Sequence, residues 1–320
     1  MLILVPTTQR TGCILIMLVC IFCAFRYKES KIKGTKPGAF SFFVLGDFGM
    51  KGGEQQIPIA EQMIKKAAIH HPALILTVGD NFYETGVTSA TDDHWTSSYT
   101  NIYKNLTHHY DWYASLGNHD YAGVPQAEID YHQVNHRWNM PARYYTFVRE
   151  TPDHQKVRFV AIDTSPYADV YYTNPMYAKE VATQDTSRQT RWIDSVLSNA
   201  KEKWKVVFGH HPAYCYQPKP GETENVRKML VPLFDKYGVQ AYICGHDHLM
   251  QHNVPEGSNV NYIISGGGAK PRITAGKENY TLFSLNVTAF TICTIKGDSL
   301  HFSFVDTAGN AIYKQSIYHN

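Results

Sequence analysis

Polar residues that can bind metal ions follow five apolar, strand-like runs of this chain. They are two carboxylates, an amide, three imidazoles and a phenol: Asp47, Asp80, Tyr83, Asn118, His210, His246 and His248. In an open α/β sheet, residues beyond the carboxyl ends of the strands gather at one edge. Oxygen ligands mixed with imidazole suit iron, zinc or manganese. The pattern therefore predicts a two-metal hydrolytic site.

A glycine stands before each of the five groups, as in Gly79-Asp80 and Gly117-Asn118. We expect the chain to leave a buried strand and turn sharply here, and glycine tolerates the backbone angles that such turns need. Gly-Asp and Gly-Asn are also ordinary turn pairs, so a single one carries little information. Five in series, each after a strand-like run and each bearing a ligand type, favour a shared site.

The same motifs, in the same order and spacing, resemble those of the metallophosphoesterase superfamily, and within it the purple acid phosphatases of the short, tartrate-resistant type. The motifs are Asp47-Phe48-Gly49, Gly79-Asp80-Asn81-Phe82-Tyr83, Gly117-Asn118-His119-Asp120, Gly209-His210-His211-Pro212 and Gly245-His246-Asp247-His248. The similarity spans about residues 40 to 305 and includes Arg137 to Pro141 and the pair Gln189 and Trp192. Many metallophosphoesterases begin with Asp-x-His, but position 49 is glycine here, and purple phosphatases use a tyrosine at the place of Tyr83 instead.

The resemblance implies two metal positions that share one carboxylate. The first would take Asp47, Asp80, Tyr83 and His248, and the second Asp80, Asn118, His210 and His246. A phenolate is a hard, anionic ligand, so Tyr83 favours Fe(III), whose charge keeps the phenol deprotonated. The neutral ligands of the second position favour a divalent ion: Fe(II), Zn(II) or Mn(II).

The resemblance further implies a metal-dependent phosphoric monoester hydrolase, an acid phosphatase in which a hydroxide bridging the metals attacks phosphorus. His119, beside a metal ligand, is placed to protonate the leaving oxygen, and Asp120 is expected to orient its imidazole. One departure concerns Lys219, which stands where the mammalian-like enzymes carry a second pocket histidine. His211, where they have tyrosine, is a candidate to compensate.

Two other functions stay open at this stage. The site would also suit a phosphodiesterase or nucleotide hydrolase, and the fold can serve as a catalytically silent scaffold. The expected partners are small phosphate esters, with phosphoproteins and nucleotides as further candidates. Nucleic-acid binding is not expected, because 30 Lys and Arg nearly balance 28 Asp and Glu.

The apolar pattern predicts an α/β fold. Strands are expected at 42–45, 74–78, 157–162, 262–265, 290–295 and 301–305, and helices near 57–68, 187–200 and 226–237. Strand-helix alternation followed by hairpins indicates two mixed β-sheets packed as a sandwich and flanked by helices, the four-layer metallophosphoesterase fold. We expect residues 39–320 to form this single domain. Asp163 is expected to anchor a loop, and 167–185 to be either a cover of the site mouth or a plain surface excursion.

Residues 1–38 differ from the rest. Residues 12–25 are apolar and uncharged, with basic residues mostly after them. The run is shorter than the roughly 20 residues of a full membrane span, so it suits a signal peptide, with a short uncleaved anchor as the alternative. We accordingly expect a secreted or lysosome-like glycoprotein of the secretory pathway, or else a membrane-anchored one. Sequons begin at Asn105, Asn279 and Asn286. Beyond the leader, three cysteines remain, an odd count for a disulfide framework, and Cys244 is expected as a buried thiol.

Overall fold

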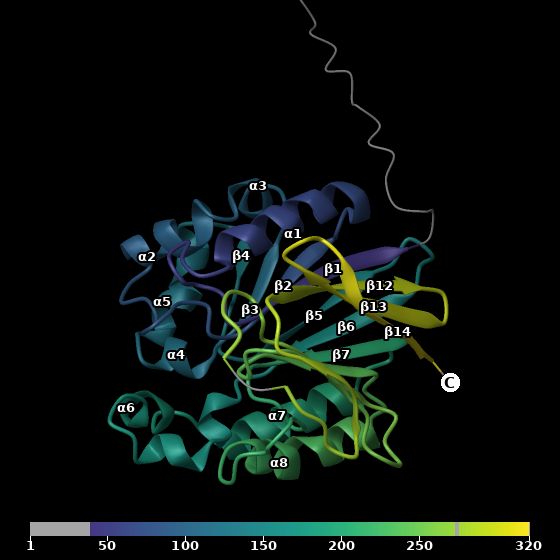
Figure 1. The fold of residues 1–320 in the computed structure, drawn as a ribbon. Helices are drawn as coiled ribbons and strands as arrows, with labels where there is room; N and C mark the ends of the chain where they lie inside the picture. The colour runs from purple at the N-terminus through teal and green to yellow at the C-terminus, as the bar shows by residue number, and fades with distance from the viewer. Residues whose placement is uncertain (1–38, 273–274, 320) are drawn as a thin grey trace, which may run out of the picture. The chain divides into compact units, whose positions relative to one another are not determined.

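A computed structural model describes residues 39–272 and 275–319, which form two packed seven-stranded β-sheets with helices outside them (Figure 1). The first sheet has the order β14-β13-β12-β1-β2-β3-β4, with β1 Phe40–Leu45, β2 Leu74–Val78, β3 Trp112–Ser115, β4 Trp138–Asn139, β12 Ala289–Lys296, β13 Ser299–Asp306 and β14 Ala311–Tyr318. The second has the order β11-β9-β10-β8-β7-β6-β5, with β5 Tyr145–Glu150, β6 Lys156–Ala161, β7 Trp204–Phe208, β8 Ala241–Cys244, β9 Met250–Asn253, β10 Asn261–Ser265 and β11 Thr281–Leu285.

Each sheet is mixed, with a block of four parallel strands. In the first sheet these are β1 to β4, and in the second β6, β7, β8 and β10; the flanking strands are antiparallel. The carboxyl ends of parallel neighbours lie at one edge, where ligands bind in such sheets. The predicted α/β sandwich is confirmed.

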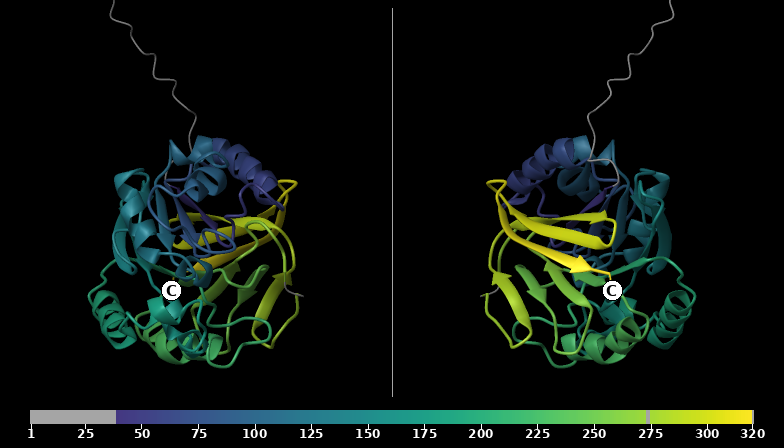
Figure 2. Two further views of the ribbon diagram at one scale, coloured as in Figure 1. Left: turned by 90° about the vertical axis from the view of Figure 1, so that its left-hand side faces the viewer. Right: turned by 90° about the vertical axis from the view of Figure 1, so that its right-hand side faces the viewer.

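The helices are α1 Gln56–His70, α2 Asp93–Trp95, α3 Lys104–Thr107, α4 Asn118–Tyr121, α5 Pro125–Asp130, α6 Ala178–Val181, α7 Thr186–Ser198 and α8 Thr223–Lys236. Helix α1 lies on one side of the two sheets, and α7 and α8 lie on the other (Figure 2). Helix α8 packs Val226, Leu230 and Phe234, one turn apart, into the core on the outer face of the second sheet. These buried contacts hold α8 in place against the second sheet.

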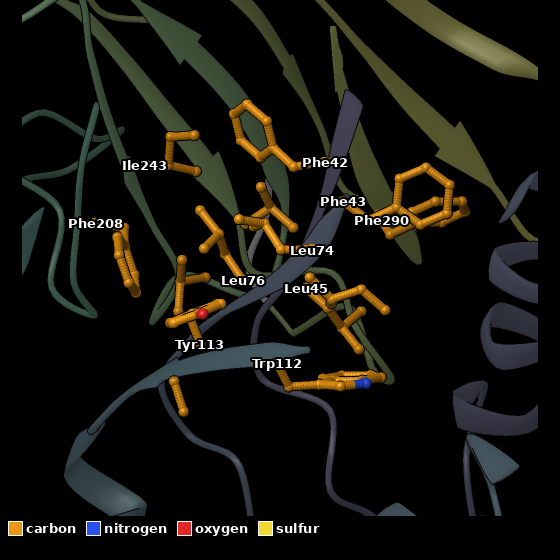
Figure 3. Packing of buried hydrophobic residues seen from close by; sticks show 14 of the residues in the cluster. Phe42, Phe43, Leu45, Leu74, Leu76, Trp112, Tyr113, Phe208, Ile243 and Phe290 are labelled. Atoms are coloured by element: carbon orange, nitrogen blue, oxygen red, sulfur yellow. The ribbon is translucent and has the colours of Figure 1, made fainter. Parts of the chain in front are cut away.

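The main core lies between the two sheets and continues across the first sheet to α1 (Figure 3). Side chains alternate along β1: the Phe42 ring meets Phe159 of the second sheet edge-on at 5.3 Å, whereas Phe43 meets Phe290 at 5.4 Å. Both faces of β1 are therefore buried, and its six residues are all buried. Burial on both faces explains why residues 42–45 of this strand are an unbroken apolar run in the sequence.

The strands that lead into the ligand groups, and the three long helices, lie within a few residues of their predicted ranges. Strands β4, β5, β9, β11 and β14 were not predicted. Strand β10 forms the expected hairpin, with β9, but its parallel pairing with β8 on the other side was not predicted. Such pairing is decided by contacts between distant segments, which local periodicity does not encode.

The predicted leader, residues 1–38, lies outside the described residues, so its role as signal peptide or anchor stays a prediction. Within 39–272 and 275–319, no helix is long and apolar enough to cross a membrane. Cys215, Cys244 and Cys293 are buried free thiols. This agrees with the state expected for Cys244.

Candidate metal centre

Five loops from two sheets meet at the candidate site. Three follow β1, β2 and β3 of the first sheet, and two follow β7 and β8 of the second. They bring together all seven residues that the sequence singled out as ligands. The side chains form two groups that share Asp80.

The first group is rich in oxygen. The Tyr83 hydroxyl oxygen lies 3.0 Å from Asp47 Oδ1, 2.7 Å from Asp80 Oδ2 and 2.9 Å from His248 Nε2. His248 Nε2 also lies 3.4 Å from Asp47 Oδ1. Four potential ligand atoms, three of them oxygens, thus surround one point.

The second group is rich in nitrogen. Asn118 Oδ1 lies 3.1 Å from His210 Nε2 and 3.0 Å from His246 Nδ1, and these two nitrogens are 3.2 Å apart. Asp80 joins this group through its other oxygen, because Oδ1 lies 3.3 Å from His210 Nε2. Asp80 therefore presents one oxygen to each group, the arrangement of a bridging ligand.

Each of the three histidines has its outer ring nitrogen bound to an acceptor. His210 Nδ1 lies 2.9 Å from the Val78 carbonyl and His248 Nδ1 lies 2.7 Å from the Lys270 carbonyl. His246 Nε2 lies 2.6 Å from Glu222 Oε1. A carbonyl or carboxylate oxygen can only accept a hydrogen bond, so the outer nitrogen must carry the hydrogen. In a neutral ring the inner nitrogen then keeps its lone pair. All three inner nitrogens are therefore ready to bind metal.

Three of the ligands adopt a strained backbone conformation. Asp47, Asp80 and His246 have φ angles of 58°, 50° and 69°. Left-handed non-glycine residues cost about 1–3 kcal/mol each and gather at functional sites. Hydrogen bonds to the same carboxylates hold the loops: the His246 amide donates to Asp47 Oδ2 at 3.0 Å, and the His119 amide donates to Asp80 Oδ1 at 2.8 Å.

The glycines before the ligands are needed mainly for close approach. A Cβ on Gly117 would lie 2.2 Å from the Asp80 amide nitrogen and Oδ1, and one on Gly245 would lie 2.3 Å from Asp47 Oδ2. Gly117 has an ordinary φ of −110°, so the turn angle that we expected there is not the reason. Gly79, with φ +85°, does fit that expectation.

Burial and mutual repulsion raise the energy of the charged groups. Burial raises the pKa of Asp47 well above its usual range, against the effect of His210, and Asp80 adds to the rise. Burial likewise raises the pKa of Tyr83, helped by both carboxylates. Burial alone would raise the pKa of Asp80, but His210 beside it holds that pKa well below its usual range. Bound metal cations would neutralise the negative charge of these closely spaced oxygen ligands and displace the protons of Asp47 and Tyr83. The donor set therefore fits a metal pair.

His119 lies at the edge of the first group. Its ring packs against that of Tyr83 at a tilt of 49°, with centroids 4.3 Å apart, and its Nε2 lies 3.9 Å from Asp80 Oδ2. Its Nδ1 bonds the Glu84 carbonyl. The ring is partly exposed, with 19% of the side-chain surface accessible, so its Nε2 can meet a substrate.

Asp120 does something other than orient His119. It accepts hydrogen bonds from the amides of Gly117 at 2.8 Å, Asn81 at 2.9 Å and Phe82 at 3.2 Å. It thus ties the loop after β2 to the loop after β3. The Glu84 carbonyl, not the Asp120 carboxylate, holds the His119 ring, which corrects the role that the sequence suggested for Asp120.

His211 is buried behind the second group. Its Nδ1 lies 2.9 Å from Thr164 Oγ1 and its Nε2 lies 2.8 Å from the Tyr171 hydroxyl. Its ring packs on that of His246, with centroids 4.5 Å apart. With both nitrogens bound and the ring fully buried, His211 supports His246 and is unsuited to replace the missing pocket histidine.

The tyrosine-rich segment around Asp169–Tyr172 and α6 packs against the site. The Asn118 amide group donates to the Tyr177 hydroxyl at 3.4 Å, and Tyr171 is bonded to His211. The segment is thus more than a surface excursion. Behind it, the Gln189 side chain bonds both backbone groups of Asp163, at 2.8 and 2.9 Å, which agrees with the expected anchoring role of Asp163.

Two residues of the site escaped the sequence analysis. Glu222 bonds His246, and Glu84 holds His119 through its backbone. Every residue has a backbone carbonyl, so the residue type at position 84 does not indicate this contact. Glu222 stands twelve positions after His210 in a stretch without apolar periodicity, so no local pattern in the sequence distinguishes it.

Comparison with known proteins agrees with this geometry. Residues 40–250 match the family described as Calcineurin-like phosphoesterase. Purple acid phosphatase 17 of Arabidopsis thaliana is 31% identical over 271 residues, covering 79% of this chain and 77% of the relative. Tartrate-resistant acid phosphatase type 5 of Homo sapiens is 28% identical over 304 residues, covering 88% and 91%.

Solved structures share the fold. The protein titled GAP50, the anchor in the inner membrane complex of Plasmodium, aligns with a TM-score of 0.76 at 23% identity, over 88% of this chain and 90% of that one. Purple acid phosphatase PPD1 from yellow lupin (Lupinus luteus) seeds aligns with a TM-score of 0.66 at 13% identity, over 88% and 54%. The fold and the site define the class as a calcineurin-like phosphoesterase. Within that class the chain belongs to the purple acid phosphatases, a family membership that implies a binuclear metal centre.

Proposed function

We propose that this chain is an acid phosphatase that hydrolyses phosphate monoesters at a centre of Fe(III) and one divalent ion, Fe(II), Zn(II) or Mn(II). The observation that carries the proposal is the Tyr83 hydroxyl, within 3.0 Å of Asp47, Asp80 and His248. A phenol oxygen among carboxylates suits a hard trivalent ion. The neutral amide and imidazoles of the second group suit a divalent one.

When bound, the two ions supply an activated water molecule and positive charge that offsets the charge of the phosphate. Asp80 fixes the separation of the two positions, because its oxygens serve both groups. His119 Nε2 lies 3.9 Å from Asp80 Oδ2 at the edge of the first group, and in its protonated form it can pass a proton to the leaving alcohol oxygen. The Glu84 carbonyl keeps the ring in that orientation.

Lys219 takes part at the rim of the second group. Half of its side chain is exposed, and its Nζ lies 3.4 Å from Glu222 Oε1 and 3.1 Å from His246 Nε2. A lysine here carries a fixed positive charge, which Glu222 offsets, and it does not serve as an imidazole acid. Proton donation to the leaving group therefore rests on His119.

Metal analysis and a substrate panel test the proposal. Purified protein should hold about two metal ions per chain, one of them iron, as paired-metal hydrolysis requires. His248→Ala should mainly empty the first position and His246→Ala the second. On aryl monoesters and the matching diesters, kcat/KM should be higher for the monoesters; the reverse order would favour the phosphodiesterase alternative.

The silent-scaffold alternative has a structural relative, since the Plasmodium protein of similar fold is titled an anchor. The complete set of seven candidate ligands at close distances supports an enzyme instead. Protein that binds no metal and hydrolyses none of the esters would favour the scaffold.

We further propose that the chain acts in the secretory pathway, secreted or in a lysosome-like compartment, with anchoring by residues 1–38 as the alternative. The exposed asparagines of all three sequons, Asn105, Asn279 and Asn286, support this. Protein made in eukaryotic cells should run faster on gels after glycosidase treatment. Release from membranes by alkaline carbonate would separate the secreted form from the anchored one.

A further inference from the structure

Glu222 is a buried carboxylate that stands behind the second metal position. It is 7% exposed, and its Oε1 lies 2.6 Å from His246 Nε2. It caps the start of α8, because the Val226 amide donates to its carbonyl at 3.2 Å. Since α8 is packed into the core through Val226, Leu230 and Phe234, the carboxylate is held on a rigid element.

Lys219 competes for the same ring nitrogen. Its Nζ lies 3.1 Å from His246 Nε2, within hydrogen-bond range, and 3.4 Å from Glu222 Oε1. An ammonium group only donates. If Lys219 donated to Nε2, the hydrogen of a neutral His246 ring would have to sit on Nδ1, the atom that faces Asn118 and His210. A metal could not then bind that nitrogen.

A carboxylate only accepts, so Glu222 forces the opposite choice. With Nε2–H donating to Glu222, Nδ1 keeps its lone pair and points into the second group. Lys219 is then satisfied by Glu222. One carboxylate thus both selects the tautomer of His246 and neutralises the cation that opposes it.

We infer that Glu222 is a positioning residue that keeps His246 in its metal-binding tautomer against Lys219, and so sets the affinity of the second metal position. The inference rests on the proposed two-metal function. Partners of this kind behind a metal ligand change metal affinity by about 10- to 100-fold when removed. The first position, whose histidine is held by the Lys270 carbonyl, should not depend on Glu222.

Metal retention tests this without reference to activity. Metal-loaded wild type, Glu222→Ala and Glu222→Gln are dialysed against a graded series of chelator, and both metals are measured. Glu222→Ala should lose the second metal at a chelator concentration about 10- to 100-fold lower than wild type does. Its iron content and its visible absorption, which report on the first position with Tyr83, should be unchanged. Glu222→Gln, which keeps an acceptor oxygen, should fall between. Glu224→Ala, two positions further on and exposed, should match wild type.

The double variant Lys219→Met/Glu222→Ala is the sharper test, because it also removes the competing donor. It should recover part of the affinity lost in Glu222→Ala. The inference would be overturned if the double variant retained the second metal no better than Glu222→Ala. It would also be overturned if Glu222→Ala retained that metal as well as wild type, or lost both metals equally. Wild type without a second metal would overturn the proposed function and this inference together, whereas two metals in wild type and in Glu222→Ala would overturn this inference alone.

Discussion

At the scale of single residues, Tyr83 links the identity of the metal to the visible absorption of the protein. Its hydroxyl is buried between two carboxylates and an imidazole, and burial with those charges raises its pKa well above the usual range. A neutral phenol in that place would be a poor ligand. A trivalent cation reverses the balance, because its charge stabilises the phenolate.

Tyr83→Phe should therefore remove the visible absorption band expected of the oxidised, iron-loaded protein, while part of the metal remains. Absorption spectra and metal content of the same samples measure this. Tyr99→Phe is the matched control, since within the described residues the buried Tyr99 hydroxyl has no hydrogen-bond partner. A wild type that is active, colourless and free of iron would contradict the assignment.

His119→Ala should lower turnover by roughly 10²- to 10⁴-fold for substrates with poor leaving groups, the usual range for a positioned acid. Activated aryl phosphates need less protonation, so their loss should be smaller. Steady-state rates on an alkyl and an aryl phosphate measure the difference, with His136→Ala, an exposed histidine, as control. Equal losses on both substrates would mean that His119 only positions phosphate.

At the scale of elements, the site depends on how closely the strand ends approach one another. The loop after β3 passes so near the loop after β2 that no side chain fits between Gly117 and Asp80. Asp120 then binds amides on both loops. The position of the bridging carboxylate is thus a property of two loops together.

Gly117→Ala should displace Asp80, because the added Cβ would lie 2.2 Å from its amide nitrogen and Oδ1. We expect loss of both metals together and a destabilisation of about 1–3 kcal/mol, as for other overpacked sites. Metal analysis and thermal unfolding measure the two effects. Gly53→Ala, at an exposed position outside the site, serves as control. Two bound metals with an unchanged Tm in Gly117→Ala would contradict this account.

At the scale of the whole molecule, a buried histidine joins the two sheets. His252 of β9 binds the Tyr313 hydroxyl of β14 through Nδ1 at 3.0 Å and Asn261 Oδ1 through Nε2 at 2.9 Å. Its ring meets Phe302 edge-on at 5.0 Å. Burial lowers the pKa of His252 to about 4, from 6.5. Folding therefore requires a neutral ring there.

This makes acid a destabilising influence on the folded chain. Between about pH 6.5 and 4 the unfolded chain binds a proton at His252 that the folded chain does not, so stability falls as the pH falls through this window. The effect is on the order of 3 kcal/mol for a shift of this size. His252→Gln should be less stable than wild type at pH 7, with a shallower loss down to pH 4.

Thermal unfolding of both proteins across this pH range gives the comparison. His301→Gln, at an exposed position on the neighbouring strand β13, should keep the slope of wild type. An identical slope in His252→Gln would show that His252 does not carry the effect.

The sequence by itself determined the ligand types and the strands that present them. Asp47, Asp80 and His210 each follow a buried run and a glycine, and both signals are local, because burial sets the composition of a strand and close approach demands glycine. The structure brings these residues together in the two groups that share Asp80. Tertiary structure alone decided the rest. The contact of Glu222 with His246, the carbonyl of Glu84 behind His119, and the pairing of β9 and β11 join segments distant in the chain. Such contacts depend on how helices and sheets pack. They produce no periodic pattern in the sequence around either of the two residues.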